Sequence, residues 1–435
     1  MLSAGKIARG RILDRTGAVL AESVRAGAVY ERQYHVPEGL SQLVGYVDPR
    51  FGRAGVERYF DGVLAGSAPH QGWQGVVQEL LGITAASDVV LSVERTASTV
   101  AEKALRATGR PGAVVAIDVA TGAIVAMASL PGFDPANLGR DWPGLSNAVT
   151  SPFLNRALSG LFPPGSAFKP VVAAAALEKG WVTPDTSFYC AGERWVDGQV
   201  IRDFGGVAHG NLTLSQALAV SCNVTFSGLG IALGPQVIGD FATRLGIGRD
   251  WQLGVPSARS SFPRGAKDAW QGAELGIGQG SLVVTPLDMA AMAVTIARGG
   301  NLQPPYVVEK TTGFAPSGTA LDTAAGARLG GIPPAERVLS PLTAARLKEM
   351  MVLVVDEGTG TAAGIAGVRV AGKTGSAENP RGAAHAWFIG FAPAENPRYA
   401  VSVVVENGGL GGQVAAPVGG RILKYLLSQP RATTR

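Results

Sequence analysis

A serine and a lysine three residues apart are the first residues in this sequence whose types and spacing allow chemistry. Ser166 and Lys169 follow a Pro-Pro-Gly loop and precede the helix-forming stretch 173–179. Because Pro170 fits a helix only in its first turn, Ser166 is predicted at the helix N-terminus with Lys169 on the same face. There the helix dipole favours negative charge on the serine, and a lysine kept neutral by burial can accept its proton.

The same pattern has an ordinary structural interpretation. A serine often caps a helix, and the lysine that follows it can be a solvated surface residue. Ser3 and Lys6 have the same spacing with no predicted helix behind them. The Ser-x-x-Lys pair alone therefore leaves both interpretations open.

A second group, Ser221 and Asn223, follows the predicted helical stretch 212–220. Side chains at positions i and i+2 of a loop can point into one cleft. A simple turn, which serine and asparagine both favour, explains the pair equally well.

A third group, Lys373 to Ser376, ends an apolar strand with the sequence Lys-Thr-Gly-Ser. Gly375 permits a close approach to the backbone. On an exposed edge strand the N–H groups can bind an extended substrate, and Lys373 with Thr374 and Ser376 would hold a carboxylate. The alternative is an edge strand whose lysine prevents edge-to-edge pairing.

The elements around these groups predict an α+β fold. Two hairpins, at 113–127 and 386–405, flank a mostly helical region, which indicates an antiparallel sheet with its first and last strands together. A final helix is expected over 420–427. Residues 1 to 88 form a smaller β-rich module, since the hydrophobic pattern becomes denser from Asp88.

Composition excludes several classes of protein. The 435 residues are 46% hydrophobic and 16% charged, which excludes intrinsic disorder. The net charge is +5 and no run of lysine and arginine reaches five, so no nucleic-acid partner is expected. No stretch approaches 18 apolar residues, so the chain as written is expected to be soluble.

Metal and cofactor chemistry is not expected either. Cys190 and Cys222 are too few for a disulfide framework or a zinc site, and both are expected to be unpaired. The histidines are scattered without ligand spacing; they are His35, His70, His209 and His385.

Together and in this order, the three groups resemble the motifs of class B penicillin-binding proteins, which are peptidoglycan D,D-transpeptidases. The resemblance covers nearly the whole chain. Further segments that resemble the family are 9–17, 55–57, 128–135, 155–157 and 276–280. The last of these is rich in glycine but lacks the spacing of a dinucleotide-binding loop.

The resemblance implies a role for each motif residue. Ser166 would attack the carbonyl of a D-Ala-D-Ala bond and Lys169 would take its proton. Ser221, supported by Asn223 and Lys373, would pass that proton to the leaving amine. An amine from a second stem peptide would resolve the acyl-enzyme into a cross-link, and β-lactams would acylate the same serine.

The resemblance also implies a substrate-binding strand. Thr374, Gly375 and Ser376 would bind the terminal carboxylate, and the backbone N–H groups of Ser166 and Ser376 would form an oxyanion hole. The family usually has threonine where this chain has Ser376. The hydroxyl is kept, so we expect the carboxylate contact to be kept as well.

By the same resemblance, residues 1–88 form a pedestal or dimerisation module and residues 89–435 a transpeptidase domain that includes an all-helical subdomain. The expected partners are peptidoglycan stem peptides, β-lactams and a membrane glycosyltransferase. The expected location is the extracytoplasmic face of the bacterial cytoplasmic membrane, with the family's usual membrane anchor absent from this sequence.

Two other functions use the same motifs. A serine β-lactamase or β-lactam sensor shares the serine chemistry, but no convincing Glu-x-x-x-Asn loop lies between Ser221 and Lys373, and the module at 1–88 is superfluous for it. A non-enzymatic scaffold is the second alternative, and the intact motifs argue against it. The rate at which an acylated serine is hydrolysed separates a β-lactamase from a transpeptidase.

Overall fold

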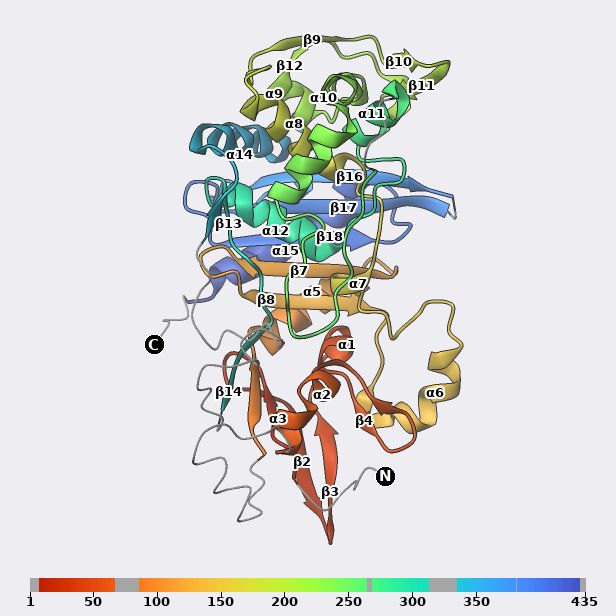
Figure 1. The fold of residues 1–435 in the computed structure, drawn as a ribbon, viewed down its shortest axis with the longest axis vertical. Helices are drawn as coiled ribbons and strands as arrows, with labels where there is room; N and C mark the ends of the chain where they lie inside the picture. Colours follow the sequence, from red (N-terminus) through yellow and green to blue (C-terminus); the bar gives the residue numbers. More distant parts are fainter. Residues whose placement is uncertain (1–7, 67–85, 264–267, 313–334, 381, 431–435) are drawn as a thin grey trace.

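The computed structural model describes residues 8–66, 86–263, 268–312, 335–380 and 382–430. Figure 1 shows a small N-terminal module at one end, a sheet covered by helices in the middle, and a mostly helical head at the other end. Ser3 and Lys6 lie outside the described residues. Within the described ranges, no helix combines the length and the apolar character that crossing a membrane requires.

The central sheet is antiparallel and has the order β16-β17-β18-β7-β8. Both predicted hairpins are present, and the pairing of β18 with β7 brings the two together, as predicted. The strands are β7 (Gly112–Asp118), β8 (Ile124–Leu130), β16 (Ala371–Asn379), β17 (Gly382–Ala392) and β18 (Tyr399–Val405).

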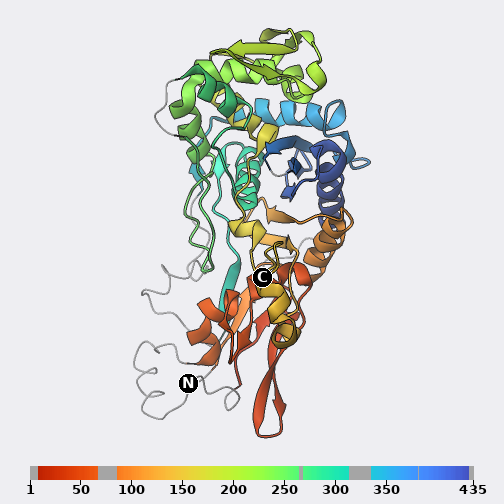
Figure 2. The same ribbon diagram turned by 90° about the vertical axis from the view of Figure 1, so that its right-hand side faces the viewer.

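Helices cover both faces of this sheet. Val114 and Val115, neighbours in β7, belong to different hydrophobic clusters, because successive side chains of a strand point to opposite faces. Helices α5 (Arg95–Arg106) and α15 (Gly411–Ser428) pack against the face that carries Val114. Helix α12 (Pro286–Ala297) packs against the opposite face, which carries Val115. Figure 2 shows these helices on the two sides of the sheet.

Helix α15 begins nine residues before its predicted start at residue 420. The sequence pattern did not predict this first part of the helix because it contains several glycines, and glycine is a weak helix former. A Cβ atom on Gly411 would lie 2.2 Å from the carbonyl oxygen of Gly375, and one on Gly419 would lie 2.3 Å from the Phe388 ring. These glycines therefore let the helix approach the sheet closely.

The N-terminal sheet takes strands from both sides of the predicted boundary at residue 88. Its order is β14-β6-β1-β2-β3. The strands are β1 (Ile12–Leu13), β2 (Val19–Ala26), β3 (Val29–Tyr34), β6 (Asp88–Leu91) and β14 (Val308–Thr312). Strand β6 starts at the predicted boundary, and β14 lies far beyond it in the sequence. The division of the chain into two domains at residue 88 stays a prediction.

The head was expected to be all-helical, and this detail is wrong. Two short antiparallel pairs, β9 with β12 and β10 with β11, lie beside its helices. Gly192 and Gly198 adopt positive φ angles of 90° and 78° and turn the chain between these strands. The elements of the head are α8 (Lys169–Glu178), β9 (Ser187–Cys190), β10 (Glu193–Val196), β11 (Gln199–Arg202), β12 (Gly210–Thr213), α9 (Leu214–Ala219), α10 (Asn223–Arg244) and α11 (Ala269–Gly276).

Candidate active site

Ser166 lies in a short 3-10 turn, Gly165–Phe168, that leads directly into α8. Gly165 has a φ of 53°, and its N–H donates to the carbonyl oxygen of Gly278 at 2.9 Å. Gly278 also has a positive φ, of 73°, and a Cβ atom there would lie 2.0 Å from the Gly165 oxygen. The glycine-rich segment 276–280 therefore packs directly beneath the serine turn.

Lys169 is the first residue of α8 and is fully buried, which excludes the solvated lysine of the alternative interpretation. Its Nζ donates to the carbonyl oxygen of Ser221 at 2.6 Å, to Ser221 Oγ at 3.3 Å and to Asn223 Oδ1 at 2.8 Å. Burial lowers the pKa of Lys169 to about 7, although Cys222 and Asp203 act in the opposite direction. A large fraction of this amine is therefore neutral near pH 7.

Ser221 has a left-handed backbone conformation between α9 and α10, with a φ of 65°. For a residue other than glycine this costs about 1–2 kcal/mol. The conformation leaves both the carbonyl oxygen and the hydroxyl of Ser221 in contact with Lys169. Strain of this kind at a polar cluster is typical of functional sites.

Asn223 begins α10 and is held by hydrogen bonds on three sides. Its side chain accepts from Lys169 through Oδ1 and donates through Nδ2 to the carbonyl oxygen of Arg202 at 2.8 Å. Its backbone N–H donates to Asp203 Oδ1. Asp203 was missed by the sequence analysis, because no local pattern links residue 203 to the loop at 221–223.

Lys373 reaches the same hydroxyl from strand β16. Its Nζ donates to Ser221 Oγ at 3.0 Å and to the carbonyl oxygen of Thr374 at 2.9 Å. Lys373 is fully buried, so it does not protect an exposed edge. Burial lowers the pKa of Lys373 well below its usual value, and the nearby charge of Lys169 adds to the effect.

The rest of the Lys-Thr-Gly-Ser segment faces the serine turn. Strand β16 is at the end of the sheet order, and a Cβ atom on Gly375 would lie 2.6 Å from the carbonyl oxygen of Pro164. Thr374 Oγ1 lies 2.6 Å from Thr359 Oγ1, and Ser376 Oγ accepts from the N–H of Gly411 at 3.1 Å. Thr359 was also missed, since the sequence around it carries no recognisable signal.

All the predicted site residues therefore gather between the serine turn, the loop between α9 and α10, and strand β16. Two buried amines, two serine hydroxyls and an edge strand are suited to acyl transfer through a serine nucleophile. Among the described residues, none forms a hydrogen bond with the Ser166 hydroxyl, which leaves that oxygen available to a substrate.

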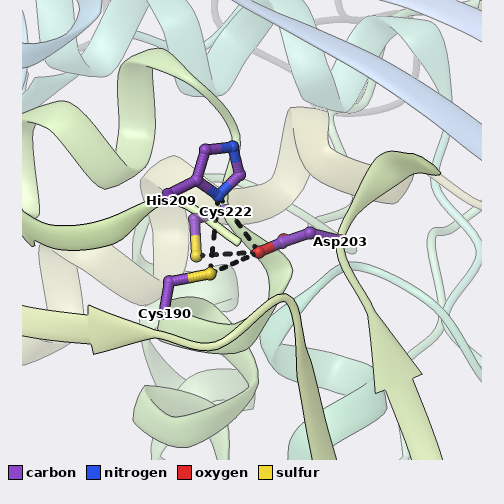
Figure 3. Close-up of side chains that lie close together, drawn as sticks. All are labelled: Cys190, Asp203, His209 and Cys222. Carbon is purple, nitrogen blue, oxygen red and sulfur yellow. Dashed lines mark hydrogen bonds and ion pairs between the residues drawn. The ribbon is translucent and has the colours of Figure 1, made fainter. Parts of the chain in front are cut away.

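A second cluster lies directly behind the loop that carries Ser221 and Asn223. Ligand-type atoms of Cys190, Asp203, His209 and Cys222 all lie within 4.8 Å of one another (Figure 3). The expectation that the histidines are scattered is wrong for His209, which lies beside both cysteines and Asp203. The turns around β9, β11 and β12 bring together residues that are 13 and 19 positions apart, spacings that match no metal-binding sequence pattern.

Comparison with known proteins decides the family. Residues 112–424 match the family model described as the penicillin binding protein transpeptidase domain, and residues 9–90 match the penicillin binding protein A dimerisation domain. The chain belongs to the class B penicillin-binding proteins. The resemblance found in the sequence is confirmed, and so is the α+β fold that it implied.

Individual members of the class B penicillin-binding proteins are similar over most of the chain. Peptidoglycan D,D-transpeptidase PbpA of Mycolicibacterium smegmatis is 33% identical over 94% of this chain and 87% of its own length. The ceftriaxone acyl-enzyme complex of penicillin-binding protein A from M. tuberculosis has a TM-score of 0.87 at 30% identity, covering 97% of this chain and 99% of that one. The D,D-transpeptidase domain of a peptidoglycan glycosyltransferase from Eggerthella lenta has a TM-score of 0.84 at 32% identity, covering 97% and 98%.

Proposed function

We propose that this chain is a peptidoglycan D,D-transpeptidase that works through an acyl-enzyme on Ser166. The observation that carries the proposal is the meeting of two buried amines, Lys169 and Lys373, at the Ser221 hydroxyl beside the serine turn. The family relationship supports it, because relatives that match 94% of this chain bear the name peptidoglycan D,D-transpeptidase.

In the first step the Ser166 oxygen attacks the carbonyl of a D-Ala-D-Ala bond. The neutral amine of Lys169 takes the serine proton, since its pKa of about 7 leaves that amine partly unprotonated. The C–N bond then breaks, and Ser221 delivers a proton to the departing D-alanine amine. Lys169 and Lys373 both contact the Ser221 hydroxyl, so either can return the proton to it.

In the second step an amine of another stem peptide attacks the ester on Ser166. The new C–N bond forms the cross-link and the ester C–O bond breaks. The proton of the attacking amine returns to Ser166 through the same groups, which restores the free enzyme.

Substrate binding is assigned to strand β16. Thr374, Gly375 and Ser376 would receive the terminal carboxylate, and the backbone N–H groups of Ser166 and Ser376 would stabilise the oxyanion. The hydroxyl contacts of Thr374 and Ser376 with Thr359 and Gly411 restrict the directions in which they can donate.

We assign catalysis to residues 89–435 and a non-catalytic supporting role to residues 1–88, because every motif residue lies beyond that boundary. Stem peptides hang from glycan strands that are polymerised outside the cytoplasmic membrane. A chain that joins them is therefore expected at the extracytoplasmic face, beside a membrane glycosyltransferase that supplies the strands.

Labelling with a fluorescent penicillin tests the proposal. We expect one covalent adduct per chain, located by peptide mass spectrometry on Ser166, and no adduct in Ser166→Ala. The adduct should remain on the protein long after the labelling reaction is complete, as in an enzyme that does not hydrolyse β-lactams. A synthetic stem pentapeptide, supplied with an acceptor amine, should be converted to a cross-linked dimer. An adduct on Ser221, or rapid release of the hydrolysed drug, would contradict the proposal.

A further inference from the structure

One half-buried histidine lies beside the active site and has no part in the proposed reaction. His385 is in β17, where it pairs with Ala377 of β16, one residue beyond Ser376. Its ring meets the ring of Phe162 edge to face, with 5.6 Å between the ring centroids. Phe162 begins the loop that leads through two prolines and a glycine to Ser166. His385 therefore adjoins both the substrate-binding strand and the serine loop.

The ring of His385 accepts a hydrogen bond from the backbone. Its Nδ1 atom lies 3.1 Å from the backbone nitrogen of Asn407. Because a backbone N–H can only donate, Nδ1 carries no proton, and the neutral ring has its proton on Nε2. A protonated imidazole has hydrogens on both nitrogens and cannot accept this bond. The contact with Asn407 therefore exists only while His385 is neutral.

Asn407 stands at a strained point of the chain. It follows β18 with a φ of 52°, a left-handed conformation that asparagine tolerates better than most residues. Its side chain accepts from Asn379 Nδ2 at 3.0 Å, and its N–H is held by His385. The N–H of Gly409 donates to a carbonyl oxygen of β17 at 2.8 Å. These contacts hold residues 406–411, the turn that joins β18 to α15, against strands β16 and β17.

This turn brings Gly411 to the substrate-binding strand. The N–H of Gly411 donates to Ser376 Oγ at 3.1 Å. A Cβ atom on Gly411 would lie 2.2 Å from the carbonyl oxygen of Gly375 and 2.4 Å from that of Trp387, so no space separates the turn from the two strands. A shift of the turn would therefore move the groups assigned to the substrate carboxylate and to the oxyanion.

We propose that His385 is a positioning residue for acyl transfer, whose neutral ring fixes the turn 406–411 and, through Gly411, the hydroxyl and backbone of Ser376. Protonation of the ring breaks the bond to Asn407 and loosens the turn. This role rests on the function proposed above. It gives the acylation rate a second group, besides Lys169, that must be neutral.

The charged groups near the ring keep it neutral at pH 7. Among the described residues, those on the neighbouring elements are Glu406 in the turn, Arg156 before the serine loop and the exposed Glu378 in β16, and residues 157–165 contribute none. Arg156 Nε binds Glu406 Oε1 at 2.5 Å and so offsets much of its charge. Burial lowers the pKa of His385 from its usual value, although Glu406 acts in the opposite direction. The ring therefore becomes protonated only in more acidic solution.

Two substitutions separate the hydrogen bond from the ring. His385→Asn can place an oxygen where Nδ1 lies and still accept from Asn407, but it does not titrate. His385→Phe keeps a ring against Phe162 and accepts nothing. At about pH 8 we expect labelled penicillin to acylate His385→Asn within about twofold of the parent rate. We expect His385→Phe to react about three- to tenfold more slowly, the factor for one lost hydrogen bond between neutral groups.

A pH profile separates this role from a merely structural one. Lys169 limits the parent and His385→Asn alike, so its titration cancels in the ratio of their acylation rates. The ratio of parent to variant should stay near one at about pH 7–8 and fall about three- to tenfold below about pH 6, as His385 is protonated. His35→Phe is the matched control, because His35 pairs with Glu22 in the N-terminal module and should not alter acylation at any pH.

Hydrogen exchange gives a readout that needs no penicillin. Peptides covering residues 406–411 should exchange faster in His385→Phe than in the parent at one fixed pH, and His385→Asn should match the parent. A rate ratio that stays constant down to about pH 5 would overturn the proposal. So would acylation or exchange in a folded His385→Phe variant equal to that of the parent.

The proposed function can fail separately. A parent chain that forms no adduct would contradict the acyl-enzyme on Ser166, and hydrogen exchange would still test whether His385 holds the turn 406–411. If His385→Phe does not fold, the pH dependence of the rate ratio for His385→Asn decides.

Discussion

Lys169 and Lys373 approach one hydroxyl group from two different elements, with their Nζ atoms 3.3 Å and 3.0 Å from Ser221 Oγ. Both lysines are fully buried, and burial lowers the pKa of each amine. Two ammonium groups in contact with the same hydroxyl would repel each other, so the arrangement favours a state in which at least one amine is neutral. The hydroxyl between them can pass a proton from one amine to the other.

The first prediction separates the roles of the two lysines. Lys169→Arg keeps a positive charge but removes the neutral form that can act as a base. We expect the second-order rate of penicillin acylation to fall by about a thousandfold, within the range for loss of a general base. Lys373→Arg should lose less, because in the proposed mechanism it mainly assists Ser221 and substrate capture.

Thermal melts of both variants serve as the control, since each arginine must fit a fully buried position. If Lys169→Arg is folded and reacts within a few-fold of the parent, Lys169 is not the base and the mechanism must be rebuilt around Lys373.

The second prediction concerns pH. The pKa of Lys169 is about 7, so the fraction of neutral amine increases as the pH rises through that value. The acylation rate should therefore rise between about pH 6 and pH 8 and then level off. Lys169→Met should show a low rate without this rise. A parent rate that stays constant over the same range would show that deprotonation of Lys169 does not limit acylation.

The third prediction separates strain from chemistry at Ser221. Ser221→Ala and Ser221→Gly both remove the hydroxyl, but only glycine adopts a φ of 65° without steric cost. Acylation should fall by a similar factor in both, about a hundredfold for a lost proton relay. Denaturant unfolding should show the glycine variant to be more stable than the alanine variant by about 1 kcal/mol. Equal stability would mean that the left-handed conformation is not retained in solution.

How far the fold follows from the sequence depends on how local its signals are. The hairpins at 113–127 and 386–405 were predicted because their short apolar runs and the turn residues between them lie within a few positions of one another. Helix α15 was predicted too short because its glycines serve packing against Phe388 and the strand at Gly375, contacts that exist only after folding. Strand β14 joins β6 across more than two hundred residues of sequence, which no local pattern can reveal.

The same distinction holds for the site. Ser166, Lys169, Ser221 and Asn223 stand in short motifs and were found in the sequence. Thr359 and Asp203 each act by touching a motif residue from a distant segment, so their roles became visible only in three dimensions. The cysteine and histidine cluster was missed for the same reason.

The fourth prediction concerns Gly278, which lies beneath the serine turn. Gly278→Ala would place a Cβ atom 2.0 Å from the Gly165 oxygen, so the turn must shift. We expect a stability loss of about 2 kcal/mol or more and slower acylation by about tenfold or more, although residue 278 need not touch substrate. Gly198→Ala is the control, since Gly198 has a similar φ of 78° with no atom within 4 Å.

Gly198→Ala should cost about 1 kcal/mol through its backbone alone and leave acylation unchanged. Acylation that is equally fast in the Gly278→Ala variant and the parent would show that the serine turn does not depend on this contact.

The last prediction concerns Thr359, whose hydroxyl lies 2.6 Å from that of Thr374. In the proposed mechanism Thr374 binds the substrate carboxylate, so its hydroxyl must be directed outward from the strand. Thr359→Val keeps the shape of the side chain but removes the hydrogen-bond partner, which is worth about 0.5–1.5 kcal/mol. We expect the penicillin concentration for half-maximal acylation rate to rise by about three- to tenfold, while the limiting rate changes little. Thr359→Ser keeps the hydroxyl and should restore the parent value, because it keeps the contact that orients Thr374. A lower limiting rate with an unchanged half-saturating concentration would instead show that the Thr359 hydroxyl supports the reacting groups and not substrate binding.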